Sequence, residues 1–269
     1  MRSFLFSVAY WTLSVLYALT AILTLIIPGR GATTTIIRSY SRAMRLALRL
    51  FAGIRTSASG HANLPEDGAY IVAAKHQSWG DGFMAYSEIP GLVFVTGDHL
   101  EKLPLVGGIL RKLGAIVIDT CGGGNRKAAS LSEGIARTKA NGDRVLIYPE
   151  GHLAPIDHKM RYKAGVWHMY EEMQVPVVPV ATNLGLFWAQ TEHKKTKGHG
   201  VIEFLEPIQP GLAKREFLDL LETRIETRTA ELVAKARGTD PVPAILLSDP
   251  KKGTAAKPDQ AVSAPDWEA

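Results

Sequence analysis

The sequence predicts an α/β fold, with a mixed and mostly parallel sheet flanked by helices and an N-terminal membrane helix in front of it. Short runs of β-branched and other apolar residues alternate with segments of helix length through the middle of the chain, which is typical of α/β domains. Polar residues begin directly where two of these runs end, and open α/β sheets carry their reactive groups at such strand ends. A length of 269 residues is enough for one large domain with appendages.

The first 60 residues predict a membrane anchor. Residues 4–27 carry no charged side chain and are long enough, as a helix, to cross a hydrocarbon core of about 30 Å. The alternative is a cleaved signal peptide, but the run is too long for one and ends without a small-x-small cleavage site. Residues 1–60 contain seven arginines and neither acidic residues nor lysine. Most of these arginines follow the apolar run, which predicts that the body lies at the cytoplasmic face of the inner membrane.

Residues 34–54 predict a basic amphipathic helix. Arg38, Arg42, Arg45 and Arg49 recur at a spacing of three to four residues, with apolar residues on the opposite face. Such a helix suits the surface of an anionic bilayer, and the alternative is an ordinary helix packed on the domain. Because the positive charge is concentrated beside an apolar run, nucleic-acid binding is not expected.

The α/β domain is expected between residues 61 and 238. Its expected strands are residues 69–74, 92–96, 115–119, 144–148, 177–182 and 201–205. Its expected helices are residues 105–113, 126–140, 161–173 and a last helix that ends at Arg237, with Gly238 as its cap. Residues 239–269 show no periodicity and are predicted to be disordered. The single cysteine, Cys121, cannot form an intrachain disulfide, which fits a reducing compartment.

His76 and Asp81 are the candidate catalytic pair, directly after the strand-like run 70–74. Neutral imidazole is suited to take a proton from an attacking hydroxyl near pH 7, and a carboxylate on its other nitrogen fixes the tautomer. Five residues along a helix turn through about 500°, so His76 must precede the helix and Asp81 must lie in its first turn. Gly80 is expected to ease this fold-back. The alternative is a structural histidine at a strand end followed by a helix-start aspartate.

A second acidic turn, residues 148–151, follows the run 144–147. Glu150 and Gly151 in this turn are candidates for positioning a substrate. The alternative is a turn carboxylate at a helix start. The histidines near this turn have no recognised ligand spacing, so no metal is expected.

Five blocks of the sequence occur in a distinctive order: His76 with Asp81, residues 114–119, residues 148–151, residues 163–165 and residues 175–180. In this order they resemble the blocks of the glycerolipid acyltransferases, above all the 1-acylglycerol-3-phosphate O-acyltransferases of bacterial phospholipid synthesis. The resemblance covers residues 70–183 and is specific because the blocks occur in the family's order.

The resemblance implies a membrane-bound O-acyltransferase. It implies that a fatty acyl group moves from acyl carrier protein or coenzyme A to the free hydroxyl of 1-acylglycerol-3-phosphate, giving phosphatidic acid. The implied partners are membrane lipids, a lysolipid acceptor and the acyl thioester, and no further cofactor is implied.

The family's two phosphate-reading arginines are replaced here by Thr120 and Leu153. A glycine-rich loop at a helix start offers free N–H groups and added charge for an anion, so it is a candidate phosphate cradle; the alternative is a flexible surface loop. The candidate phosphate-binding residues are Gly122, Gly123, Gly124, Arg126 and Lys127, with Arg161 and Lys163 further along the chain.

Two rival functions remain open from the sequence. The first is the same chemistry on another lysolipid, such as a lyso-ornithine lipid, and the exchanged arginines motivate it. The second is a non-catalytic membrane scaffold of the same fold, against which the intact His76 and Asp81 argue.

Overall fold

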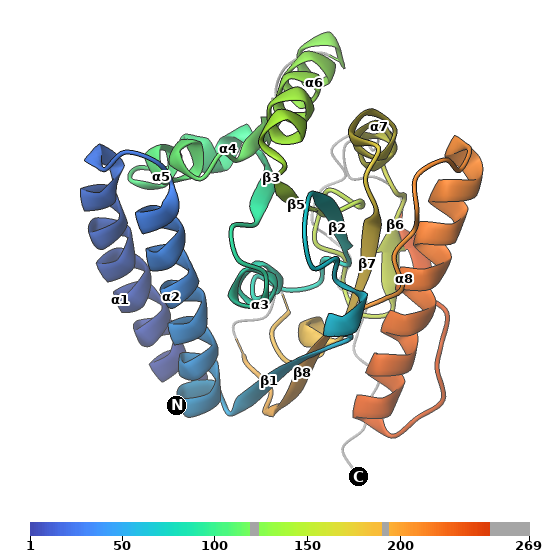
Figure 1. The fold of residues 1–269 in the computed structure, drawn as a ribbon. Helices are drawn as coiled ribbons and strands as arrows, with labels where there is room; N and C mark the ends of the chain where they lie inside the picture. Colours follow the sequence, from blue (N-terminus) through green and yellow to red (C-terminus); the bar gives the residue numbers. More distant parts are fainter. Residues whose placement is uncertain (119–123, 190–193, 248–269) are drawn as a thin grey trace.

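The computed structural model describes residues 1–118, 124–189 and 194–247, with the side chains of 124–128 not described (Figure 1). These residues form a seven-stranded sheet in the order β1-β8-β7-β2-β5-β3-β4. Its strands are β1 (Ile54–Ser59), β2 (Tyr70–Ala74), β3 (Val93–Gly97), β4 (Ile116–Ile118), β5 (Arg144–Ile147), β7 (Val177–Thr182) and β8 (Gly198–Phe204). Strands β7 and β8 pair antiparallel, and the other neighbours pair parallel. The predicted mixed, mostly parallel sheet is confirmed.

Helices cover both faces of the sheet. The helices are α1 (Arg2–Leu23), α2 (Gly31–Ala47), α3 (Asp81–Glu88), α4 (Asp98–Glu101), α5 (Val106–Lys112), α6 (Gly124–Asn141), α7 (Ala164–Met173) and α8 (Lys214–Arg237). Alternate residues of a strand point to opposite faces, so in β2 the side chains of Val72 and Ala74 join the layer of α1, α2 and α3, while Ile71 and Ala73 join the layer of α6, α7 and α8. Burial on both faces explains why the central strands are continuous apolar runs. Gly238 caps α8 with a φ of 71°, as expected.

The apolar N-terminal segment forms α1, which lies beside α2 at the side of the molecule away from α8 (Figure 1). In the part of the chain that the structure describes, α1 with the turn after it is the one helix long and apolar enough to cross a membrane. One side of α1 packs on the body. The ring of Phe6 lies 5.1 Å from that of Trp188, and the hydroxyls of Ser14 and Tyr40 are 2.7 Å apart. The opposite side is an exposed apolar stripe, formed by Phe4, Leu5, Val8, Trp11, Val15, Leu16, Leu19 and Leu23.

The predicted helix over residues 34–54 ends earlier than expected. Helix α2 stops at Ala47, and a π-helical turn follows from Leu48 to Ala52. Gly53 ends this turn with a φ of 75°, a backbone conformation that favours glycine. The chain then enters β1, which pairs with β8 at one edge of the sheet. The boundary of the anchor at residue 60 is therefore wrong, because β1 belongs to the sheet. Polar residues in β1 hid this strand, since an edge strand needs little apolar surface.

The four arginines predicted to face lipid, three in α2 and Arg49 in the π-helical turn after it, do not share one exposed side, so that prediction is wrong for two of them. Nε of Arg38 donates to the main-chain oxygen of Ser87 at 3.3 Å. Arg45 forms an ion pair with Glu88, whose pKa is lowered by hydrogen bonds and charge that outweigh its partial burial. The remaining two, Arg42 and Arg49, are exposed. Packing on the domain, the alternative for this helix, therefore describes half of its basic residues.

Of the tail predicted to be disordered, residues 248–269 lie outside the described residues, and the prediction is wrong for one short described segment. Strand β9 (Ile245–Leu247) pairs parallel with β6 (His158–Met160). Two contacts to Asp157 fix the start of this pairing: the main-chain N of Ile245 donates to its main-chain oxygen at 2.8 Å, and Arg237 forms an ion pair with its carboxylate at 2.8 Å. Three consecutive apolar residues against an open strand edge are enough to form such a bridge.

Candidate active site

The two sequence blocks meet at one edge of the sheet. Strands β2 and β5 are parallel neighbours, with Ile71 opposite Val145 and Ala73 opposite Ile147. Parallel neighbours end at the same edge, so the loop after β2 and the turn after β5 lie together. The two strand ends that the sequence marks with polar residues are therefore neighbours in the sheet.

His76 and Asp81 form the expected pair. Nδ1 of His76 lies 3.1 Å from Oδ2 of Asp81. A carboxylate only accepts, so Nδ1 carries the proton and Nε2 keeps a free lone pair for a hydroxyl proton. The imidazole is partly exposed, whereas Asp81 is buried. Asp81 is the first residue of α3, and His76 precedes that helix, as the spacing predicts.

The Asp81 carboxylate also folds the loop that carries His76. Its Oδ2 accepts the main-chain N–H groups of Gln77 and Ser78, each at 2.8 Å. Gly80 has a role different from the predicted one. Its φ of −78° suits any residue, but a Cβ at this position would lie 2.6 Å from Leu184, so glycine is needed for close packing.

Tyr148 stacks on the imidazole of His76. The two rings are 3.8 Å apart with an angle of 13° between their planes. The Tyr148 hydroxyl is buried and has no hydrogen-bond partner within the described ranges. Burial, reinforced by the charge of Asp81, holds the pKa of Tyr148 well above its usual value, so the hydroxyl stays neutral. The contact of Tyr148 with His76 is therefore one of ring faces, which limits the imidazole's rotation.

Glu150 is placed differently from its predicted role at a substrate. Its side chain is fully buried and faces the interior. Oε1 lies 2.8 Å from Nζ of Lys75 and accepts the main-chain N–H of Met160 at 2.9 Å. Oε2 accepts the main-chain N–H of His76 at 3.4 Å. Burial raises the pKa of Glu150, and the charge of Lys75 offsets only part of that rise.

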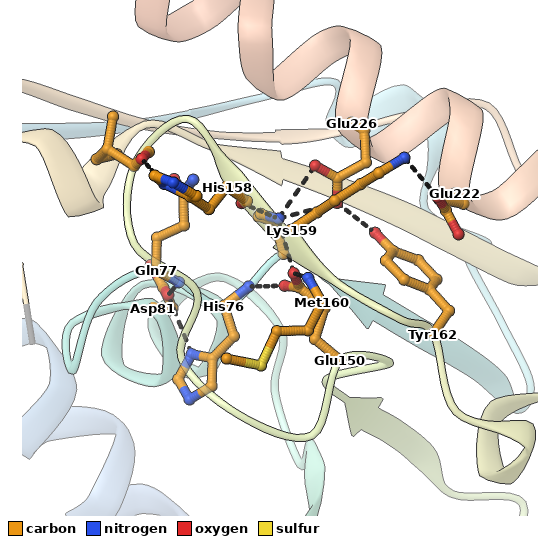
Figure 2. Close-up of polar contacts among 12 residues, drawn as sticks. His76, Gln77, Asp81, Glu150, His158, Lys159, Met160, Tyr162, Glu222 and Glu226 are labelled. Atoms are coloured by element: carbon orange, nitrogen blue, oxygen red, sulfur yellow. Dashed lines mark hydrogen bonds and ion pairs between the residues drawn. The ribbon is translucent and has the colours of Figure 1, made fainter. Parts of the chain in front are cut away.

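Three residues of this buried network have no counterpart among the sequence predictions. Lys75 Nζ reaches Glu226 of α8 at 2.9 Å. The hydroxyl of Tyr162 donates to the same Glu226 carboxylate at 2.9 Å (Figure 2). One signal could have found Lys75, because a lysine between a buried strand and a catalytic histidine needs a buried partner. Nothing in the sequence pattern points to Glu226, which lies on a long charged helix.

Of the predicted anion-binding residues, Lys163 lies against the acidic turn. Gly151 has a φ of 67°, and a Cβ on it would lie 2.9 Å from Nζ of Lys163, so glycine leaves room for the ammonium group. Arg161 is exposed nearby in sequence. The remaining predicted cradle, Gly122 and Gly123 with the side chains of Arg126 and Lys127, lies outside the described residues, and Gly124 begins α6. Within the described ranges, no group of three His, Cys, Asp or Glu side chains is placed to hold a metal ion.

Taken together, the geometry defines a histidine–aspartate site at the edge of an α/β sheet that can deprotonate a hydroxyl. Residues 55–183 match the Acyltransferase family. A 1-acyl-sn-glycerol-3-phosphate acyltransferase of Pseudomonas aeruginosa is 27% identical over 64% of this chain and 66% of its own length. A 1-acyl-sn-glycerol-3-phosphate acyltransferase alpha of Ovis aries is 27% identical over 68% of this chain and 64% of its own length.

The crystal structure of the 1-acyl-sn-glycerophosphate acyltransferase of Thermotoga maritima has the same fold, with a TM-score of 0.74 and 21% sequence identity. The superposition covers 87% of this chain and 98% of the Thermotoga maritima chain. The family match and the curated relatives support the glycerolipid acyltransferase family that the resemblance of the blocks predicts. The matches span slightly less than two thirds of the length of these curated relatives.

Proposed function

We propose that this protein is an O-acyltransferase that uses His76 as its general base. Nε2 would take the proton of an acceptor hydroxyl as that oxygen attacks a thioester carbonyl, and Asp81 would stabilise the imidazolium that forms. As the C–S bond of the thioester breaks, the imidazolium would give this proton to the leaving thiolate, so that the products are an ester and a free thiol. The observation that carries the proposal is the 3.1 Å contact between Nδ1 of His76 and the buried Asp81, which leaves Nε2 available.

We infer that the acceptor is a lysolipid, with 1-acylglycerol-3-phosphate as the favoured substrate and phosphatidic acid as its product. The names of the relatives support this acceptor. Lys163 supports it as well, because its ammonium group lies against Gly151 in the turn next to the stacked His76 and Tyr148 rings. A charge-assisted contact from lysine suits a phosphate monoester. The donor is an acyl thioester of acyl carrier protein or coenzyme A.

We further propose that α1 lies in the surface of the membrane. Both ends of the N-terminal segment 2–27 contact the α/β domain: Ser3 Oγ accepts the main-chain N–H of Lys195 at 2.9 Å, and Lys112 Nζ donates to the main-chain oxygen of Ile27 at 2.6 Å. A helix that is attached to the domain at both ends presents its exposed apolar stripe to lipid along its whole length. The arginines of the N-terminal segment favour the anionic cytoplasmic face.

The deciding experiment measures acyl transfer by the purified full-length protein. Acyl carrier protein and coenzyme A thioesters are offered as donors, and lysophosphatidate, lysophosphatidylethanolamine and a lyso-ornithine lipid as acceptors. We expect transfer to lysophosphatidate and its loss, by about 10²- to 10⁴-fold, in His76→Ala. Preferred acylation of the lyso-ornithine lipid would change the acceptor but keep the reaction. Undiminished transfer by His76→Ala would reject the mechanism.

A further inference from the structure

Lys75, the residue before the catalytic base, is a charge in the interior of the protein. Its side chain has no exposed surface, and Nζ contacts Glu150 at 2.8 Å and both oxygens of Glu226, at 2.9 and 3.0 Å. It also donates to the main-chain oxygen of His158 at 3.1 Å. Placing an ammonium group in the interior is costly unless its partners compensate it closely.

The network around Lys75 holds more negative than positive charge. One ammonium group faces two carboxylates, and neutral donors add to oxygens that Lys75 already contacts: the Tyr162 hydroxyl donates to Oε1 of Glu226, and the main-chain N–H of Met160 donates to Oε1 of Glu150. An apolar set of the same volume generally stabilises a fold as well as, or better than, a buried ionic set. Stability alone therefore does not account for these charges.

The network connects four separate segments at the catalytic edge. Lys75 directly follows β2. Glu150 follows β5, Met160 ends β6, and Glu226 lies on α8 (Figure 2). The remaining oxygen of Glu150 reaches the main-chain N–H of His76. His76 is thus held on its ring by Asp81 and at its main-chain N–H by Glu150, and its main-chain oxygen accepts the N–H of Ala154 at 2.7 Å. The family match ends at residue 183, so α8 and Glu226 lie outside it.

We propose that Lys75 and Glu226 are positioning residues of the acyl-transfer site and act through Glu150 on the main chain of His76. Helix α8 then forms part of the catalytic apparatus, although it lies outside the matched region. In this role Glu150 holds the main chain of the general base in place and does not touch the acceptor. Displacing a reacting group by about 1 Å costs up to about 100-fold in rate, so a variant that weakens the contact of Glu150 with His76 should lower kcat. This inference rests on the proposed acyl-transfer function.

The test is a double-mutant cycle between Glu226 and Glu150 in the full-length protein. Glu226→Gln and Glu150→Gln are each expected to lower kcat by about 10- to 100-fold and to leave the KM for the acceptor within about two-fold of wild type. The double variant is expected to be no slower than Glu150→Gln alone, because Glu226 acts only through Glu150. Glu222→Gln is the matched control: it lies one turn earlier on α8 and pairs with Lys159 outside the network, so its kcat should stay unchanged (Figure 2).

Two results would overturn the proposal. A raised KM with unchanged kcat in Glu150→Gln would make Glu150 a substrate ligand. Multiplying effects in the double variant would make Glu226 independent of Glu150. If Glu226→Gln does not fold, Tyr162→Phe replaces it in the same cycle, since it removes one donor to Glu226 and keeps every charge. A smaller loss of kcat that vanishes in the Glu150→Gln background is then expected, and a loss that persists there rejects the proposal.

A measurement without turnover separates this inference from the proposed function. The amide proton resonance of His76 reports its hydrogen bond to Glu150. We expect this resonance to shift in Glu226→Gln, or in Tyr162→Phe where that variant replaces it, and not in Glu222→Gln. If wild-type protein transfers no acyl group, the function fails, and this resonance still decides the structural coupling. Identical resonances in the test and control variants reject the coupling even if His76→Ala has confirmed the acyl transfer.

Discussion

Oδ2 of Asp81 lies 3.1 Å from Nδ1 of His76 and also accepts two main-chain N–H groups of the loop between them, those of Gln77 and Ser78. One carboxylate oxygen therefore orients the imidazole and folds the loop that carries it. The spacing of five residues follows from this double role, because a loop of this length lets the first residue of α3 reach back to the end of β2. The orientation of the base depends on the charge of Asp81, whereas the shape of the loop depends on its acceptor oxygen.

Asp81→Asn should separate these two roles. The amide oxygen can still accept from the loop, so the fold and the melting temperature should change little. The neutral amide no longer stabilises the imidazolium that forms on His76, and we expect kcat to fall by about 10³- to 10⁴-fold. Asp157→Asn makes the same chemical change at a partly exposed ion pair and should keep nearly full activity. Wild-type kcat in Asp81→Asn would show that the pair is structural only.

Tyr148→Phe tests whether Tyr148 uses only its ring. The hydroxyl is buried without a partner in the described part of the chain, so its removal should raise the free energy of unfolding by about 1 kcal/mol and keep kcat near wild type. Tyr162→Phe is the matched control and should be destabilised, because that hydroxyl donates to Glu226. Urea unfolding at neutral pH measures both differences. A large loss of kcat in Tyr148→Phe would assign chemistry to the hydroxyl.

The same variant carries a pH prediction with a defined sign. Burial holds the pKa of Tyr148 in the folded state well above its usual value. Below the pKa of about 10 that Tyr148 has when unfolded, its hydroxyl is neutral in both states, so its effect on stability does not change with pH there. As the pH rises above about 10, the unfolded chain ionises first, and wild type loses stability that Tyr148→Phe does not lose. The stability advantage of Tyr148→Phe should therefore grow between neutral pH and pH of about 10.5. A constant difference over this range would contradict the placement of the hydroxyl.

The sequence predicts those parts of the molecule that depend on local pattern. Buried runs such as 70–74 and 177–182 are apolar because helices cover both faces of the sheet, so their strands were recognisable. The pair His76 and Asp81 was also recognisable, since it depends on a spacing of five residues. Edge strand β1 was not, because its polar residues pair only with β8.

The rest depends on contacts between distant segments. Arg45 has the spacing of a lipid-facing arginine, but Glu88 of α3 turns it inward. Glu150 has the sequence context of a substrate ligand, but Lys75 and Glu226 hold it in the interior. Such partners are separated by up to 151 residues, and no local pattern encodes them.

Membrane attachment should depend on the exposed stripe of α1. Trp11 and Leu19 are 67% and 52% exposed, and burying each in lipid contributes about 2 kcal/mol. Replacing both with Gln should weaken binding to neutral phosphatidylcholine vesicles by about 100-fold or more, at low and high salt alike. Replacing Arg42 and Arg49 with Gln should weaken binding only to anionic vesicles, and less so in high salt, because ions screen that attraction. Undiminished binding of the stripe variant in a vesicle flotation assay would refute the role of α1.

Lys163→Met tests the head group at the acidic turn. The ammonium group lies against Gly151, and a charge-assisted contact to phosphate contributes roughly 1.5 to 3 kcal/mol, so we expect the KM for lysophosphatidate to rise by at least about 10-fold with kcat little changed. The KM for a lysolipid without a phosphate monoester should stay the same, because Lys163 would have no anion to bind there. Lys159→Met removes a similar charge, but its partner is Glu222, so it should leave both KM values unchanged. Steady-state kinetics with the two acceptors measure the comparison. An equal rise for both acceptors would mean that Lys163 supports the shape of the turn and that another part of the chain reads the phosphate.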